Sequence, residues 1–195
     1  MAIPPIHYCS LCGTKVERKI PPGEDRLRAV CPSCDTIHYQ NPKIVAGCIP
    51  EWEGQILICR RAIEPRVGFW TFPAGFMEMG ESTEEAAARE TMEEAQADVR
   101  ITALYAVYTL RHVDQVYTIY RGTLRRHEFG VGDESLEVKL VDPDCIPWDE
   151  LAFPVIREAL THYVNDLRQH CFGVHFGSIA PMNRTNTATQ MKSAR

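Results

Sequence analysis

Two closely spaced pairs of cysteines near the N-terminus limit the folding of this chain more than any other feature. The pairs are Cys9-x-x-Cys12 and Cys31-x-x-Cys34, and 18 residues separate them. Each pair offers two thiolates from one tight turn, and Gly13 lets the first turn close under a bound ion. Two pairs at this separation are typical of a structural Zn²⁺ site with four thiolate ligands. We therefore expect residues 1–40 to form a small zinc ribbon.

Disulfide bonds or a redox-active pair would be the alternative use of these four thiols. The N-terminus lacks a basic region followed by an apolar stretch, so no secretory signal is visible and we expect a cytoplasmic, reducing setting. No apolar run reaches the roughly 18 residues that a membrane helix needs, so no membrane partner is expected. The remaining cysteines stand singly, and we expect them to be buried core residues: Cys48, Cys59, Cys145 and Cys171.

The composition is that of an ordinary globular protein. The chain has 195 residues, of which 45% are hydrophobic and 24% charged, and its net charge is −5. This length suits one medium domain with a small appendage. Because the negative charge gives no overall attraction to nucleic acid, we do not expect nucleic acid as a partner.

After Asn41-Pro42 the sequence changes to strand and helix patterns. Apolar, β-branched runs at 43–49 and 55–59 predict a hairpin around a turn at 51–54. Further strands are expected at 101–110, 116–124 and 136–141, and helices at 82–95 and 154–168. The polar, unpatterned segment 177–195 is expected to be a mobile tail. The sequence therefore predicts an α+β domain over residues 41–176.

The helix expected at 82–95 has a clear start and a narrow apolar stripe. Ser82 is a good N-cap, and Glu85 three positions later completes a capping box. Ala88, Met92 and Ala95 fall at i, i+4 and i+7, so we expect this stripe to pack on a sheet.

Three carboxylates gather on the same helix, on the face that we expect to lie opposite the stripe. Glu90, Glu93 and Glu94 fall at i, i+3 and i+4. A solvated charged face would explain them, but hard divalent cations also require such carboxylate oxygens. Ala86 and Ala87 flank this face and are small enough to let a bulky substrate approach.

The loop before the helix favours the metal-binding explanation. The chain resembles the Nudix hydrolase family, whose signature is G-x₅-E-x₇-R-E-U-x-E-E-x-G-U, with U a bulky aliphatic residue. The matching residues are Gly75, Glu81, Arg89, Glu90, Glu93 and Glu94. Gln96 departs from the signature glycine, through which the chain would leave the helix in a left-handed conformation, so the helix exit is an open question. Thr91 and Ala97 replace bulky aliphatic residues and predict looser packing beneath the helix.

This resemblance implies a fold, a reaction and a set of roles. The fold would be the Nudix α/β/α sandwich with a mixed sheet, and the reaction would be metal-dependent attack of water on a phosphorus of a nucleoside diphosphate derivative. Glu90, Glu93 and Glu94 would hold Mg²⁺ or Mn²⁺. Arg89 would orient one of them through a bidentate ion pair, and Glu81 would be an auxiliary carboxylate.

Further candidates lie outside the signature helix. Glu134, with Glu137 second, is the candidate for the water-activating base that family members often take from a later loop; an ordinary loop residue is the alternative. The substrate-binding candidates are Arg60, Arg61, Phe69 and Gly75. The arginines would hold phosphate oxygens, although solvated surface residues explain them equally well. Phe69 would stack on a base, whereas core packing is the better explanation for Trp70.

The resemblance also narrows the substrate. A zinc ribbon joined to a Nudix domain resembles the NADH pyrophosphatases, but their S-Q-P-W-P-F-P-x-S motif is missing here. The compact ribbon is more similar to zinc-ribbon Nudix proteins with FAD or ADP-ribose pyrophosphatase activity. We therefore expect cleavage of FAD or ADP-ribose to AMP and a phosphorylated remainder.

Two other functions remain alternatives. A nucleotide-sensing or nucleic-acid-binding protein would contact nucleic acid through basic residues of the ribbon and use the Nudix domain as a receptor. Acidic residues near these basic residues weaken the positive charge of the ribbon. Hydrolysis of nucleoside triphosphates or NADH is the alternative within the same chemistry. A further hypothesis is that the ribbon helps to form a homodimer, which a monomer in sedimentation at micromolar concentration would contradict.

Overall fold

The computed structural model describes residues 4–181, which divide into two compact units between Pro42 and Lys43. The first unit contains a small antiparallel sheet of three strands. Its strands are β1 (Glu17–Lys19), β2 (Arg28–Val30) and β3 (Ile37–His38). Cys9 and Cys31 are buried beside this sheet, together with Ala29 and Val30 of β2. The apolar interior is therefore very small, as expected for a segment that needs a metal to fold.

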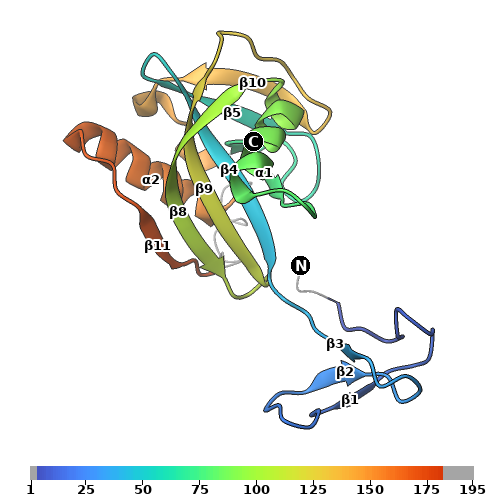
Figure 1. Ribbon diagram of the computed structural model, residues 1–195. Coiled ribbons are helices and arrows are strands. Elements are labelled where there is room, and N and C mark those ends of the chain that lie inside the picture. Colours follow the sequence, from blue (N-terminus) through green and yellow to red (C-terminus); the bar gives the residue numbers. More distant parts are fainter. Residues whose placement is uncertain (1–3, 182–195) are drawn as a thin grey trace, which may run out of the picture. The chain divides into compact units, whose positions relative to one another are not determined.

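The second unit is built on a mixed sheet with helices on both faces (Figure 1). The strands follow the order β10-β5-β4-β9-β8-β11, with β6 paired to β5 and β7 paired to β4. Their bounds are β4 (Lys43–Trp52), β5 (Gln55–Arg61), β6 (Trp70–Thr71), β7 (Ala74–Phe76), β8 (Val99–Leu110), β9 (Gln115–Leu124), β10 (Ser135–Val141) and β11 (His175–Ser178). The helices are α1 (Thr83–Ala95) and α2 (Pro154–Gln169), with short 3₁₀ turns at Pro143–Cys145 and Trp148–Glu150.

Strand β4 has the central place in this sheet. It pairs in parallel with β9 from Lys43 to Glu51, and its opposite edge pairs antiparallel with β7. The predicted hairpin between β4 and β5 is confirmed, but the two strands pair only at its tip, at Glu51 and Trp52. Beyond the tip β7 takes the place of β5 beside β4, and this brings the loop before α1 into the sheet.

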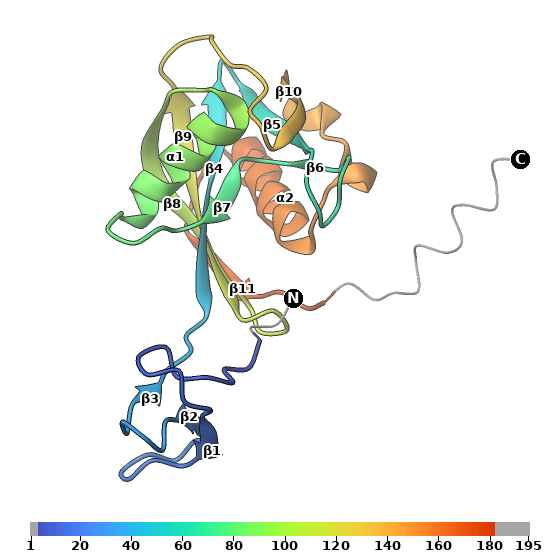
Figure 2. The same cartoon turned by 90° about the vertical axis from the view of Figure 1, so that its right-hand side faces the viewer.

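Two hydrophobic clusters fill the two sides of the sheet, and each includes one helix. Helix α2 contributes Val155, Ile156 and Leu160 to the larger cluster. Helix α1 contributes Ala86 and Ala87 to the second cluster. Figure 2 shows the two helices on opposite sides of the strands. The predicted α/β/α sandwich with a mixed sheet and two helices is therefore confirmed.

The buried face of α1 is only partly the predicted one. Ala95 of the expected stripe is fully buried and Ala88 packs against the second cluster, but Met92 is 46% exposed, and the face extends instead to Ala86 and Ala87, which are fully buried. The two alanines therefore pack on the sheet and do not leave room for a substrate. Glu90 and Glu94 belong to this buried face as well. Because small alanines let the helix approach the sheet closely, the carboxylates at its border are withdrawn from water.

The exit of α1 keeps the left-handed conformation although no glycine is present. Gln96 has φ 48° and ψ 34°, and its N–H donates to the carbonyl of Met92. Thr91 and Ala97, which stand where the signature has bulky aliphatic residues, are both fully buried. The hydroxyl of Thr91 donates to the carbonyl of Ala87 at 2.8 Å and so has a partner inside the core.

Three other expectations concern the C-terminal tail, the single cysteines and membrane-spanning helices. The tail was expected to begin at Gly177, but β11 continues to Ser178 in parallel pairing with β8; residues 182–195 lie outside the described part. Cys48 and Cys59 are buried as predicted, whereas Cys145 and Cys171 are exposed. Within residues 4–181, neither helix has the length and apolar character that crossing a membrane would require.

Candidate active site and metal centre

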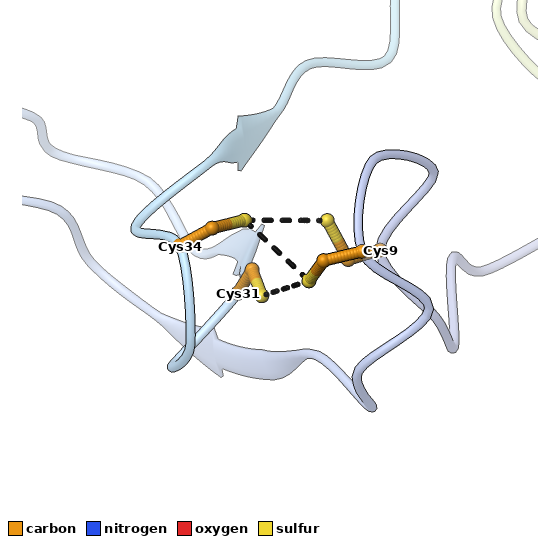
Figure 3. Close-up of side chains that lie close together, drawn as sticks. Cys9, Cys31 and Cys34 are labelled. Carbon is orange, nitrogen blue, oxygen red and sulfur yellow. Dashed lines mark hydrogen bonds between the residues drawn. The ribbon is translucent and has the colours of Figure 1, made fainter.

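The four paired cysteines converge on one point of the first unit (Figure 3). The sulfur of Cys9 lies 3.6 Å from that of Cys34. The sulfur of Cys12 lies 3.4 Å from that of Cys31 and 3.6 Å from that of Cys34. These separations exceed the roughly 2.05 Å of a disulfide bond. Because Zn–S bonds of about 2.3 Å in a tetrahedron place sulfurs about 3.8 Å apart, the four thiols fit a Zn²⁺ ion.

The two cysteine turns have the same backbone design. The N–H of Gly13 donates to the carbonyl of Cys9 at 2.9 Å, and the N–H of Asp35 donates to the carbonyl of Cys31 at 3.0 Å. Both Gly13 and Asp35 have positive φ, 73° and 55°. The sequence points only to Gly13, but aspartate also tolerates this conformation better than most residues do.

A threonine accompanies the second cysteine of each turn. The hydroxyl of Thr14 lies 3.4 Å from the sulfur of Cys12, and that of Thr36 lies 3.1 Å from the sulfur of Cys34. These hydrogen bonds lower the pKa of both thiols, that of Cys12 to about 6. Because the thiolate is the form that binds a metal, these two thiols are the ones whose surroundings favour that form, whereas burial raises the pKa of Cys31.

In the second unit, β7 presents the signature glycine to α1. Gly75 pairs with Ala46 of β4, and a Cβ atom at Gly75 would lie 2.3 Å from the carboxyl group of Glu90. Only glycine leaves room for this carboxylate against the strand backbone. Gly75 was expected to bind substrate, but its observed neighbour is the side chain of Glu90, an expected metal ligand. The glycine sets how closely Glu90 approaches the sheet.

Arg89 connects the loop before α1 with the carboxylates on the helix. Its Nε and Nη2 atoms donate to the two oxygens of Glu81, at 3.0 Å and 2.8 Å. Its Nη1 atom donates to Glu90 at 2.8 Å and to Glu93 at 2.9 Å. The bidentate partner is therefore Glu81 and not one of the three helix carboxylates. The hydrogen bonds from Arg89 and from the N–H of Glu78 lower the pKa of Glu81 to about 2.

Glu90 and Glu94 form a pair of buried carboxylates, whereas Glu93 is exposed. The exposed fractions of Glu90 and Glu94 are 9% and 6%, and the side chain of Glu93 is 57% exposed. Burial raises the pKa of Glu90, and it raises that of Glu94 to about 8, with the neighbouring charge of Glu90 as a further cause. Two withdrawn carboxylates repel each other, and a divalent cation would neutralise both.

The residues present fit such a cation by their chemistry, because all three helix groups are hard oxygen donors. Their oxygens do not converge as tightly as the cysteine sulfurs. Among residues 4–181, the four cysteines are the only group of three or more His, Cys, Asp or Glu side chains whose ligand atoms all lie within 4.8 Å of one another. The Nη1 atom of Arg89 lies between the carboxylates of Glu90 and Glu93 and donates to both.

The loop between β9 and β10 brings Glu134 to this group. Glu134 is exposed, and its negative charge contributes to the raised pKa of both Glu90 and Glu94. Glu137, the second candidate, lies instead opposite Arg60 on the neighbouring strand, with 3.7 Å between Oε2 and Nη1. The electrostatic effect of Glu134 on both buried carboxylates therefore favours it over Glu137 as a fourth carboxylate of the site.

Gly130 and Gly132, for which no role was predicted from the sequence, hold this loop against α1. The N–H of Gly130 donates to the carbonyl of Ala95 at 2.8 Å, and the N–H of Gly132 donates to that of Glu94 at 3.2 Å. A Cβ atom at Gly132 would lie 1.8 Å from the carbonyl oxygen of Glu93. The Gly-x-Gly pattern was the available signal, since glycines in a loop often mark a close backbone approach.

The two candidate arginines differ in their surroundings. The positive charge of Arg61 lowers the pKa of Glu94, so Arg61 lies within electrostatic reach of the carboxylates. Its Nε atom donates to the carbonyl of Pro65 at 3.0 Å. Arg60 donates to the carbonyl of Gly68 at 2.9 Å and pairs with a carboxylate on β10. Of the two, Arg61 is the better placed to meet an anion at the site.

The two aromatic residues, Phe69 and Trp70, differ in their burial. Trp70 is 3% exposed and belongs to the main hydrophobic cluster, as expected for a core residue. Phe69 is half-buried, and the guanidinium of Arg66 lies 4.0 Å from its ring centroid. A base that stacks on this ring would have to share it with Arg66 or use its other face.

Both units match known protein families. Residues 7–40 match the zinc ribbon described as Nudix N-terminal, and residues 41–162 match the NUDIX domain. A crystal structure of a NUDIX hydrolase from Nitrosomonas europaea is similar with a TM-score of 0.84 and 48% identity, over 89% of this chain and 100% of that one.

Curated relatives share parts of the sequence. An ADP-ribose pyrophosphatase from Methanocaldococcus jannaschii is 29% identical over 119 residues, which are 59% of this chain and 69% of that protein. An NAD-capped RNA hydrolase from Schizosaccharomyces pombe is 40% identical over 113 residues, which are 56% of this chain but only 30% of that protein. With its signature residues assembled around α1 and residues 41–162 matched by the NUDIX domain, the chain belongs to the Nudix hydrolase family, in the branch with an N-terminal zinc ribbon.

Proposed function

We propose that this Nudix pyrophosphohydrolase cleaves the pyrophosphate bond of a nucleoside diphosphate derivative, FAD or ADP-ribose, to AMP and a phosphorylated remainder. The assembly of Glu90, Glu94 and Glu134 beside the signature glycine carries the proposal. Two of these groups are buried and electrostatically coupled to the third. Such a concentration of carboxylates suits a substrate that arrives with phosphates and a divalent cation.

The roles follow from the positions of the side chains. Glu90, Glu93 and Glu94 would hold Mg²⁺ or Mn²⁺, which when bound neutralises phosphoryl oxygens and steadies the leaving group. Arg89 keeps Glu90 and Glu93 in place through its Nη1 atom. Glu81 fixes Arg89 in turn, so we assign it a positioning role.

Glu134 is the proposed general base. It would accept a proton from the attacking water as the water oxygen bonds to one phosphorus. The bond between that phosphorus and the bridging oxygen then breaks, and the bridging oxygen leaves with the other phosphate. Arg61, whose charge already acts on Glu94, would hold a phosphate oxygen at the same place.

The relatives support two kinds of substrate that contain a pyrophosphate. One is named for ADP-ribose and several for NAD-capped RNA, and both share an ADP moiety with a second group on the pyrophosphate. We favour ADP-ribose or FAD because the motif that marks the NADH pyrophosphatases is missing from this sequence. An NAD-capped RNA is the second candidate, and it would need a surface for the RNA chain.

The test is turnover of a substrate panel in water enriched in ¹⁸O. Purified protein with its zinc content measured would be incubated with ADP-ribose, FAD, NADH, NAD-capped RNA and nucleoside triphosphates, with Mg²⁺ or with Mn²⁺. We expect AMP from ADP-ribose or FAD, and the position of the label shows which phosphorus was attacked. The variants Glu93→Gln and Glu134→Gln should lower the rate, whereas Glu84→Gln, at an exposed position of α1, should not.

The panel also separates the alternatives. Turnover of only the capped RNA would replace the preferred substrate with the second candidate. No turnover of any compound by folded, zinc-loaded protein would contradict the enzymatic proposal. We further propose a homodimer, which sedimentation at micromolar concentration tests directly.

A further inference from the structure

Helix α1 is capped at its end by Gln96, a residue with a long polar side chain in a strained backbone conformation. Gln96 adopts a left-handed conformation, φ 48° and ψ 34°, that a glycine would adopt more easily. The same strain occurs at His170, the corresponding residue of α2, with φ 51° and ψ 33°. A glutamine at this position is therefore less favourable for the helix exit than a glycine would be.

The side chain of Gln96 reaches the loop between β9 and β10. Its Nε2 atom donates to the carbonyl of Val131 at 3.0 Å. The residues on either side of Val131 are glycines whose N–H groups donate to the last carbonyls of α1, Gly130 to Ala95 and Gly132 to Glu94. Three hydrogen bonds over three consecutive loop residues thus join the loop to the end of the helix.

This anchored segment leads directly to Glu134. The N–H of Ser135 donates to the carbonyl of Gly132 at 3.0 Å, which closes a tight turn around Glu134. The carbonyl of Glu134 itself accepts a hydrogen bond from the N–H of Ala62 at 2.8 Å. The backbone of Glu134 is therefore held between the end of α1 on one side and the end of β5 on the other.

We propose that Gln96 is a positioning residue, whose side-chain amide fastens the loop of residues 125–134 to α1 and so places Glu134 beside Glu90 and Glu94. The inference rests on the proposed role of Glu134. It also assigns a use to the departure from the signature glycine: the side chain adds a tether that glycine cannot supply. The residue acts through Glu134 and does not itself touch the reacting atoms.

The variant Gln96→Gly tests the side chain without weakening the helix exit. Glycine accepts the left-handed conformation at no steric cost, so a loss of activity cannot be attributed to a strained cap. His170→Gly is the matched control, because it makes the same change at the end of the other helix, away from the loop. We expect Gln96→Gly to lower kcat about tenfold, in the range of lost outer-sphere partners, and His170→Gly to leave it unchanged.

Two further readouts distinguish positioning from a general structural effect. Amide hydrogen exchange at Gly130 and Gly132 should become at least about tenfold faster in Gln96→Gly and not in His170→Gly. In a double-mutant cycle, Gln96→Gly should cost kcat much less when Glu134→Gln is already present.

The outcomes separate this inference from the proposed function. Unchanged exchange at the two glycines, or rate losses that simply add in the double mutant, would overturn the role of Gln96 while leaving Glu134 as the base. A Glu134→Gln variant with the wild-type rate would instead overturn the proposed base, and with it this inference. A wild-type protein that turns over no substrate would contradict the proposed function itself.

Discussion

At the scale of single residues, burial of the Glu94 carboxyl group is unfavourable for stability, although the proposed metal site needs that group. Its carboxyl group is buried to 6% exposure, and burial raises its pKa to about 8. We predict that Glu94→Gln lowers the hydrolysis rate by more than about 100-fold, since even outer partners of metal ligands are worth 10- to 100-fold. The thermal midpoint should not fall, because a neutral amide replaces a buried carboxyl group whose charged form burial disfavours. Rates and calorimetry on this variant and on Glu84→Gln check both parts.

Gly75 offers a steric prediction. A methyl group there would overlap the carboxyl group of Glu90 at 2.3 Å. We expect Gly75→Ala to displace that carboxylate, to reduce activity strongly and to lower the free energy of unfolding by about 1–3 kcal/mol. Gly173→Ala is a suitable control, because a Cβ atom at Gly173 would meet no atom within 4 Å. Equal stability and activity of the two variants would contradict the close contact.

The ion pair between Glu81 and Arg89 gives stability a defined pH dependence. The pKa of Glu81 falls from an ordinary value of 4.5 to about 2 in the folded protein. A lowered pKa means that the pair stabilises the fold above pH 4.5, and that this contribution is lost as the pH falls toward 2. Urea unfolding of wild type and Glu81→Gln should therefore differ at about pH 5, differ less at about pH 3 and converge only as the pH falls to about 2. A constant difference would show that the carboxylate is not responsible.

At the scale of elements, α2 and β11 are joined by one acidic side chain. Asp166 accepts hydrogen bonds from the hydroxyl of Tyr105 at 3.0 Å and from Nε2 of His175 at 2.7 Å. Tyr105 is 1% exposed, so Asp166→Ala would leave its hydroxyl buried without this partner. We predict a loss of about 1–3 kcal/mol in the free energy of unfolding. Asp149→Ala, which removes an exposed pair at 3.9 Å, should change it by less than about 0.5 kcal/mol.

The sequence predicts the elements that have strong local signals. Helix α1 begins where its capping box places it: the hydroxyl of Ser82 accepts the N–H of Glu85, and the carboxylate of Glu85 accepts that of Ser82. The cysteine pairs and the signature carboxylates were likewise identified from their spacing. These patterns depend on neighbours in the chain, which the sequence displays directly.

The features that were missed depend on partners far away in the chain. Strands β6, β7 and β11 are 2–4 residues long, and each exists because a longer strand pairs with it. The buried face of α1 was misjudged because Glu90 and Glu94 were counted as solvent-facing charges, whereas Gly75 provides room for a buried carboxylate. The hold on Glu134 depends on backbone groups of two glycines, which leave no periodic pattern.

At the scale of the whole molecule, the two units have separate interiors, so metal loss should affect them unequally. We predict one tightly bound zinc per chain, and loss of the ribbon's ordered structure when Cys31→Ser removes a buried thiol. The Nudix unit should keep its own cooperative unfolding transition. Cys171→Ser, at an exposed cysteine outside the quartet, should retain the zinc. Metal analysis and amide spectra of the two variants test this, and unfolding of both units on zinc loss would contradict it.

The parallel pairing of β4 with β9 also bears on how the protein is made. Gln115 of β9 lies beside Lys43 of β4, although roughly 70 residues separate them along the chain. During synthesis, the central strand must therefore wait until β9 has left the ribosome, whereas all four cysteines emerge long before. Chains fold from the N-terminus as they are made, so the ribbon can capture its metal first. Until β9 has emerged, the edge of β4 that faces it stays unpaired, and such an edge exposes the nascent Nudix unit, more than the ribbon, to aggregation.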